Sequence, residues 1–379
     1  MQAASESPGG PDHAHAPSRS RELAEKIANA VLYEGYILYP YRPSSVKNRQ
    51  RWTFGGIYPA AYSRGAGGAD ACAMQTECLV EAGEGTRIDV RVRFLHIQDR
   101  VVGALDPPLP DLPATGTPDY RPVPALQMGD RVLRAWQEAV EREIAAPDLN
   151  VADLLACPHE QAFAFPATGQ IEAVRDSVGP VLAVIRREQR ALAGMVTVAA
   201  TRTDAGPVKL AVRVENRTPW RAPDVPPPSG SFGWEREDAV LQAFVSTHTL
   251  LEVRDGAFIS LIDPPAEYQA AAAVCSNVGT WPVLAGEAGA RDLLLSSPII
   301  LYDYPEVAPE SPGDLFDGTE IDEILTLRIL TMTDAEKQEM RQSDPRGRTL
   351  LDRTETLPAE QLMKLHGTLR SIRPLEGGP

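Results

Sequence analysis

The chain is short of cysteine and of long apolar runs, and each shortage excludes a class of protein. Four cysteines (Cys72, Cys78, Cys157 and Cys275) are scattered over 379 residues. They make a poor disulfide framework, so we expect a reducing compartment. No apolar window approaches the length of a membrane span, and no transmembrane helix is predicted. The first 20 residues contain no apolar core typical of secretory signals, so the expected localisation is cytoplasmic.

Positive charge is also in deficit. The chain has 37 Lys and Arg residues against 52 Asp and Glu residues, which gives a formal net charge of −15. A nucleic-acid-binding protein has to neutralise phosphates, and an anionic membrane attracts basic surfaces. The sequence therefore argues against nucleic acid and against membranes as partners. An apolar content of 43% is that of a soluble globular protein.

Motifs of the common catalytic and cofactor sites are missing as well. The chain has no GxxxxGK[ST] phosphate loop, no GxSxG nucleophile elbow, and no CxxC or HxxxH pair of metal ligands. Cys157 and His159 are close in sequence, but Cys275 would have to join them in space to complete a metal site. Buried or idle cysteines are the simpler interpretation. We therefore predict no catalytic residue and no cofactor.

Residues 296–327 stand out because they join a short apolar strand to an acidic run. Nine carboxylates and no Lys or Arg lie between Asp292 and Leu327. Acids are favoured at a helix N-terminus by the helix dipole, and carboxylate oxygens are also the ligands that calcium and magnesium take. Both interpretations stay open for the acidic stretch, residues 303–323. The candidate residues are Asp314, Asp317, Glu320, Asp322 and Glu323.

The basic aromatic stretch, residues 36–64, has the opposite character. No acid occurs between Gly35 and Ala69, and five of the ten tyrosines lie there. Arginine beside aromatic residues is typical of protein interfaces. We predict that this stretch docks against the acidic stretch within the chain, presents a surface to another protein, or does both. The predicted binding residues on the basic side are Arg42, Lys47, Arg49, Arg51 and Trp52.

Alternating apolar and polar residues predict a sheet in the middle of the chain. Residues 86–102 alternate with period two, as in a strand that is buried on one face. Turn residues at 81–86, 204–207 and 254–256 predict three antiparallel hairpins. For residues 131–146 we favour a helix, although their apolar residues also suit other pairings. The seven prolines of residues 106–125 predict an extended surface loop.

Helices are expected towards both ends of the chain. Residues 20–35 carry one apolar face, and Thr333 with Glu336 forms a capping-box pattern. A helix after Asp263 is expected to use that residue as its N-cap. The remaining expected helices cover residues 319–332, 334–341, 345–353 and 358–370.

The predicted fold class is α+β, with an antiparallel β-rich core of hairpins, helices at the N-terminus and a helical C-terminal segment. Residues 1–19 are expected to be a disordered tail, because they offer little apolar surface. Residues 20–290 are expected to form a β-rich main domain with the N-terminal helix and Pro-rich loops. Residues 291–373 would add the acidic strand and loop, with the C-terminal helices packed on the main domain.

Two segments carry a family resemblance. Residues 31–56, VLYEGYILYPYRPSSVKNRQRWTFGG, and residues 297–330, which begin SPIILYDYPEVAPE, resemble an uncharacterised bacterial protein family. The likeness extends weakly through residues 258–265, the segment after Cys275 and DPRGRTLLDRTE near the C-terminus. Genes of that family lie near those of [NiFe]-hydrogenases and their maturation factors. The resemblance implies a role beside hydrogenase assembly and supplies no catalytic residues.

Together these features predict a non-catalytic accessory protein. Its expected partner is another protein, a hydrogenase subunit or a maturation factor, as the resemblance implies. The alternative is a metal-binding or metal-handling protein, or an enzyme, that uses the carboxylates of residues 303–323, with Cys275 or the Cys157 and His159 pair.

Overall fold

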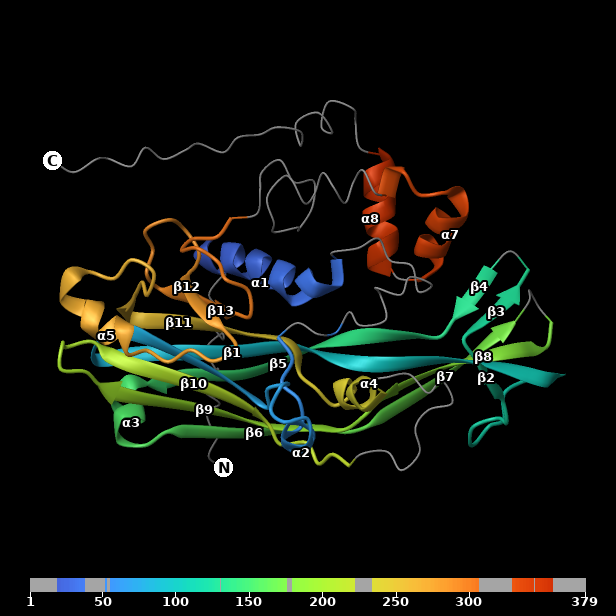
Figure 1. Ribbon diagram of the computed structural model, residues 1–379, viewed down its shortest axis with the longest axis horizontal. Coiled ribbons are helices and arrows are strands. Elements are labelled where there is room, and N and C mark those ends of the chain that lie inside the picture. The colour runs from blue at the N-terminus through green and yellow to red at the C-terminus, as the bar shows by residue number, and fades with distance from the viewer. Residues whose placement is uncertain are drawn as a thin grey trace, which may run out of the picture.

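Antiparallel strands make up most of the structure, a computed structural model that describes residues 19–37, 52, 55–129, 131–175, 179–221, 234–306, 329–343 and 345–356. Eleven strands form one sheet, and β3 and β4 form a separate pair (Figure 1). The strands are β1 (Ala73–Leu109), β2 (Arg121–Val123), β3 (Ala125–Met128), β4 (Arg131–Arg134), β5 (Trp136–Asn150), β6 (His159–Phe165), β7 (Thr168–Arg175), β8 (Val181–Gln189), β9 (Leu192–Arg202), β10 (Val208–Asn216), β11 (Val245–Ile259), β12 (Trp281–Leu284) and β13 (Leu293–Ser297).

The helices are shorter and lie around the sheet. In Figure 1, α1, α7 and α8 lie on one side of the sheet, and α3 lies on the other. The predicted β-rich, antiparallel class is therefore found. The helices are α1 (Arg19–Ile37), α2 (Ala60–Gly65), α3 (Val151–Ala156), α4 (Trp234–Val240), α5 (Gln269–Ala273), α7 (Asp334–Ser343) and α8 (Pro345–Thr356), with a 3-10 turn at Ala266–Tyr268. No helix in these ranges is long and apolar enough to cross a membrane.

Strand β1 is the axis of the sheet. Its first part pairs with β10, its middle with β11 and β5, and its last part with β8 and β2. Phe94 belongs to one core cluster and Leu95 to another, because successive side chains of a strand point to opposite faces. One cluster includes residues of β1, β5, β9, β10 and α3, and the other includes residues of α7 and α8.

The helix predicted over residues 131–146 is wrong. These residues form β4 and β5, and Ile144 of β5 lies opposite Val92 of β1. Val132, Trp136, Val140 and Ile144 recur every four residues, a spacing that places side chains on one face of a strand as well as of a helix. Pairing along β1 decides between the two.

Two of the three predicted hairpin turns are also wrong. Residues 81–86 lie inside β1 and residues 254–256 lie inside β11, where the register between the two strands shifts from Ala82/Gly256 to Arg87/Arg254. The turn-like residues therefore form a bulge in two long paired strands. The third prediction is confirmed: β9 and β10 flank residues 204–207 and pair with each other.

Other predicted elements differ in extent. Strand β1 continues to Leu109 and β2 begins at Arg121, so the loop predicted over residues 106–125 is shorter. The backbone N–H of Asp263 donates to the Ser260 Oγ, and the helical segment begins only at Ala266, so Asp263 is no N-cap. The capping box forms: Thr333 N–H donates to Glu336 at 2.8 Å, and Glu336 N–H donates to Thr333 Oγ1 at 3.3 Å.

The predicted domain boundary between residues 290 and 291 does not coincide with a break in the sheet. Strands β12 and β13 lie on either side of that boundary and pair with each other. Ile329, Met340 and Leu351, from the C-terminal helical segment, share a core cluster with Leu95 of β1. Residues 1–18, 307–328 and 357–379 lie outside the described residues. The helix predicted over residues 358–370 and residues 319–328 of the helix predicted over 319–332 therefore also lie outside them.

Candidate functional site

Most of the predicted binding residues lie outside the described part of the chain. On the basic side these are Arg42, Lys47, Arg49 and Arg51. The same holds for the acidic counterpart, which consists of Asp314, Asp317, Glu320, Asp322 and Glu323. The docking seam between the two stretches therefore stays a prediction.

Trp52, the remaining predicted binding residue, is buried. It is 4% exposed and belongs to the core cluster that contains Leu32 of α1 and Met340 of α7. In this fold its indole packs inside the protein, and its role in partner binding stays a prediction.

Two tyrosines of the basic aromatic stretch contribute to an internal polar contact. The Tyr62 hydroxyl donates to Asp70 Oδ2 at 3.0 Å, and the guanidinium of Arg236 donates to both oxygens of Asp70, from Nη2 and Nε at 3.1 Å. Arg236 also lies over the Tyr58 ring, 5.2 Å from its centroid. Burial raises the pKa of Tyr62 to about 12. These contacts tie α2 to α4.

The cysteines do not gather into a metal centre. Cys78 is fully buried in the sheet, and burial raises the pKa of its thiol. Burial also raises the pKa of Cys275 to about 11, with Glu77 as a further cause. Cys157 is exposed. Within the described residues, no group of three or more His, Cys, Asp and Glu side chains is arranged to hold a metal ion.

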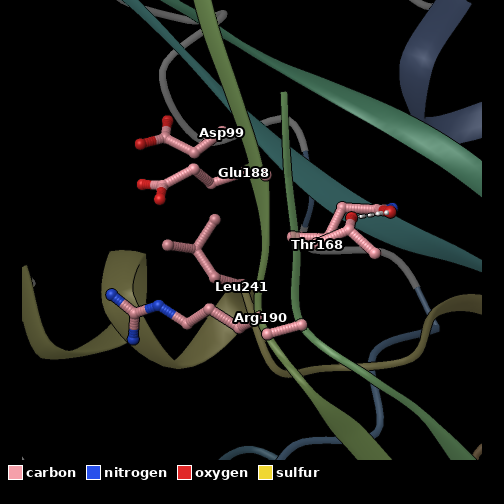
Figure 2. A pocket seen from close by; sticks show the side chains of 8 residues that line it. Asp99, Thr168, Glu188, Arg190 and Leu241 are labelled. Carbon is pink, nitrogen blue, oxygen red and sulfur yellow. Dashed lines mark hydrogen bonds between the residues drawn. The ribbon is translucent and has the colours of Figure 1, made fainter. Parts of the chain in front are cut away.

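A carboxylate pocket of about 460 Å³ opens between β1, β7, β8 and the end of α4. Asp99 of β1 lies opposite Glu188 of β8, and Figure 2 shows their carboxylates side by side, pointing in one direction. Leu241 forms an apolar wall below them, and the guanidinium of Arg190 lies farther along.

Two of the charged side chains that line this pocket already form salt bridges. Arg190 donates to both oxygens of Asp238, and Glu188 pairs with Arg186. Burial raises the pKa of Asp99, and the nearby Glu188 raises it further. Two adjacent carboxylates, one of them with a raised pKa, are a feature of acid–base sites. The described lining residues, however, include no metal-ligand set and no nucleophile beside a base.

The apolar end is the other feature of the surface. Among the described residues, seven large apolar side chains are exposed, and six of them lie between residues 262 and 302. Figure 1 shows α5, β12 and β13 together at one end of the sheet, far from β3 and β4. The six residues that define the apolar end are Ile262, Val274, Val278, Trp281, Ile300 and Tyr302.

The segment after β13 supplies the two most exposed of these side chains. Ile300 is 72% exposed and Tyr302 is 84% exposed, whereas Leu301 between them is 4% exposed. Leu301 packs against Ile27 of α1 and Leu295 of β13. The alternation therefore anchors the segment by one apolar residue and turns its two neighbours outwards.

Asp303 joins the elements that carry the apolar end. Its Oδ1 accepts a hydrogen bond from the backbone N–H of Leu284 at 2.8 Å, and its Oδ2 accepts one from the Ser260 hydroxyl. Ser260 Oγ in turn accepts the backbone N–H of Ile262 at 3.1 Å. One carboxylate thus fixes the loop of Ile262 and the segment of Tyr302 to strand β12.

Sequence reasoning singled out residues 296–327 but placed the binding function in their acids. Part of the signal for the apolar end was present in the same residues: residues 298–301 continue an apolar strand pattern, and Ile300 within it and Tyr302 next to it are exposed. In comparisons with known proteins, no family model and no curated protein matches the chain.

Proposed function

We propose that the protein is a non-catalytic accessory protein that binds a partner protein at the apolar end. The observation that carries the proposal is the concentration of exposed large apolar side chains between residues 262 and 302. Soluble proteins expose single apolar residues everywhere, but clusters of them mark interaction sites. Tyr and Trp are also the residue types enriched at interfaces and at their energetic centres.

The fixed geometry of the apolar end supports the same proposal. Ile300 and Tyr302 are held on either side of a buried leucine, and the Asp303 carboxylate ties their segment to two other elements. A surface that is already ordered loses less conformational entropy when a partner binds. Exposed side chains of this kind contribute to binding and little to folding.

The identity of the partner is a further part of the proposal. A hydrogenase subunit or a maturation factor is the partner that the resemblance of residues 31–56 and 297–330 implies. The cytoplasm is the compartment in which that partner would be met. The seam formed by the basic aromatic stretch and the acidic stretch is a second contact region for the same partner.

The metal-handling alternative finds no comparable support in the described residues. Asp303, the first carboxylate of the acidic stretch, is already engaged by Leu284 and Ser260. The Cys157 thiol lies beside the Pro158 carbonyl, at 3.6 Å, and Cys275 lies beside the Ala271 carbonyl at the same distance.

Affinity purification of the tagged chain from cells that encode it tests the proposal. The double variant Ile300→Ser/Tyr302→Ser is the matched control, since it removes two exposed apolar side chains without changing the net charge. We expect hydrogenase subunits or maturation factors to co-purify with the unchanged chain and to be lost with the variant. Equal recovery by both proteins would refute binding at the apolar end, and stoichiometric nickel, iron or zinc would favour the alternative.

A further inference from the structure

The charged residues near the apolar end indicate what charge a partner should carry. Residues 261–306 contain six acids and one base, Arg291, whose guanidinium pairs with Glu81 at 2.9 Å. Arg19 of α1 pairs with one of these acids, Glu287, at 3.3 Å. Asp263, Glu267 and Glu306 are exposed. A partner with acidic or neutral flanks would gain nothing from these carboxylates, and a second copy of this chain would meet like charges. An anionic membrane would be repelled for the same reason.

The backbone of β12 argues against binding in which a strand of the partner joins the sheet. Strand β12 is at the margin of the sheet, where an incoming strand would need free N–H and C=O groups. Pro282 has no N–H, the Leu284 N–H donates to Asp303, and the Leu284 carbonyl accepts the N–H of Tyr304 at 2.7 Å. The outward-facing N–H and C=O groups of Leu284 are thus already hydrogen-bonded. A strand of the partner would therefore find few free backbone groups at this margin of the sheet.

Backbone strain occurs next to the exposed side chains. Tyr304 has a φ of 55°, in the left-handed region that aromatic residues rarely adopt. Its hydroxyl donates to the Ala290 carbonyl at 2.9 Å, which holds the ring against the loop between β12 and β13. Strain of this kind persists where surrounding contacts fix it, and it is found more often at functional positions.

We infer that the partner presents a basic segment with apolar anchor residues, and that this segment docks on the apolar end through side chains without joining the sheet. The inference rests on the proposed function and specifies its partner. The anchors would pack on Ile300, Tyr302 and Trp281, and the lysines or arginines of the segment would face Asp263, Glu267 and Glu306.

A library of short random peptides displayed on phage provides the probe. The peptides are selected on the immobilised full chain and counter-selected on Ile300→Ser/Tyr302→Ser, whose net charge is the same, so peptides attracted by overall charge are removed. We expect the retained peptides to be rich in Lys or Arg together with aromatic or aliphatic residues. Retained peptides that are neutral or acidic overturn the inference and leave the proposed function intact. If no peptide distinguishes the two proteins, the proposed function itself fails.

Two measurements on the best peptide complete the test. The triple variant Asp263→Asn/Glu267→Gln/Glu306→Gln is expected to weaken binding about tenfold, since it removes three charge pairs at the rim of the contact. The triple variant Asp119→Asn/Glu160→Gln/Asp204→Asn removes equal charge at exposed positions elsewhere and should leave binding unchanged. Equal weakening by both triples overturns the local charge match. In a second experiment each backbone N–H of the peptide is methylated in turn. Loss of binding at every second position would show that the peptide joins the sheet as a strand, and would overturn docking through side chains.

Discussion

The backbone N–H of Leu284 donates to the carboxylate of Asp303 at 2.8 Å, while the Leu284 carbonyl accepts the N–H of the residue that follows Asp303. This exchange attaches the segment after β13 to strand β12. Because the same carboxylate also accepts the hydroxyl of Ser260, three elements meet at one side chain. This contact fixes the segment of Ile300 and Tyr302 against β12.

Replacing Asp303 tests how much that contact contributes. Asp303→Ala leaves the Leu284 N–H and the Ser260 hydroxyl without their acceptor, and we expect the free energy of unfolding to fall by about 2 kcal/mol. Urea denaturation monitored by tryptophan fluorescence measures the change. Glu306→Ala, three residues on and exposed, is the control and should stay within about 0.5 kcal/mol. Equal effects of the two substitutions would mean that the carboxylate does not hold the elements together.

Leu301 and its neighbour Tyr302 should separate folding from binding. Leu301→Ala removes a side chain that is 4% exposed, and we expect a loss of about 2–4 kcal/mol of stability from lost packing and the cavity left behind. Tyr302→Ser alters a residue that is 84% exposed and should change stability by less than about 0.5 kcal/mol. Thermal unfolding of both variants measures this difference. A strongly destabilised Tyr302→Ser would show that the tyrosine belongs to the core.

Two buried histidines predict how stability depends on pH. Burial, with the nearby Arg142 as a second cause, lowers the pKa of His96 from 6.5 to about 4, and burial lowers the pKa of His248 to about 3. The unfolded chain therefore takes up protons between pH 6.5 and 4 that the folded chain does not. We expect stability to fall with decreasing pH across this window, by about 1.4 kcal/mol per pH unit for each histidine at most.

The variant His96→Gln isolates the first of these contributions. His96 Nε2 lies 2.9 Å from the Arg190 carbonyl, which only accepts, so Nε2 carries the hydrogen, and a glutamine amide can also donate there. Urea denaturation at pH 7 and pH 4.5 should show a smaller pH-dependent loss in the variant than in the unchanged chain. Identical losses would show that His96 is protonated in the folded state.

Asp70 and Arg236 form an ion pair whose contribution is measurable by a double-mutant cycle. Asp70→Ala removes the acceptor of the Arg236 guanidinium and of the Tyr62 hydroxyl, and we expect a loss of about 1–3 kcal/mol. Arg236→Met keeps the apolar contact with the Tyr58 ring and removes the charge. The double variant should be more stable than the sum of the two single losses predicts. Strict additivity would contradict direct coupling.

Much of the fold follows from periodicity in the sequence, and the errors have physical causes. The alternation of residues 86–102 predicts the central strand correctly, since a half-buried strand repeats every two residues. The glycines of residues 81–86 resemble a turn, but they lie in a bulge, because β11 continues alongside β1 and both segments stay paired. Pairing between segments distant in sequence decided this, as it did for residues 131–146.

The sequence pointed to only two residues of the candidate site, Ile300 and Tyr302, because the other four lie outside residues 296–327. Residues 296–327 were singled out for their acids, whereas the described part of that segment shows exposed apolar side chains beside one engaged carboxylate, that of Asp303. Exposure depends on which elements cover Ile300 and Tyr302, and a pattern of residue types does not contain that information. The carboxylates of Asp99 and Glu188 are likewise adjacent only because β1 and β8 pair, although 89 positions separate them in sequence (188 − 99).

Site-specific photo-crosslinking in cells that encode the protein is the sharpest test of partner binding at the apolar end. A photoreactive phenylalanine analogue replaces Tyr302 in one sample and Asp204, an exposed residue of the β9–β10 turn, in the other. If the proposed function is right, a hydrogenase subunit or a maturation factor is crosslinked from position 302 and not from position 204. The same proteins from both positions, or none from position 302, would contradict it.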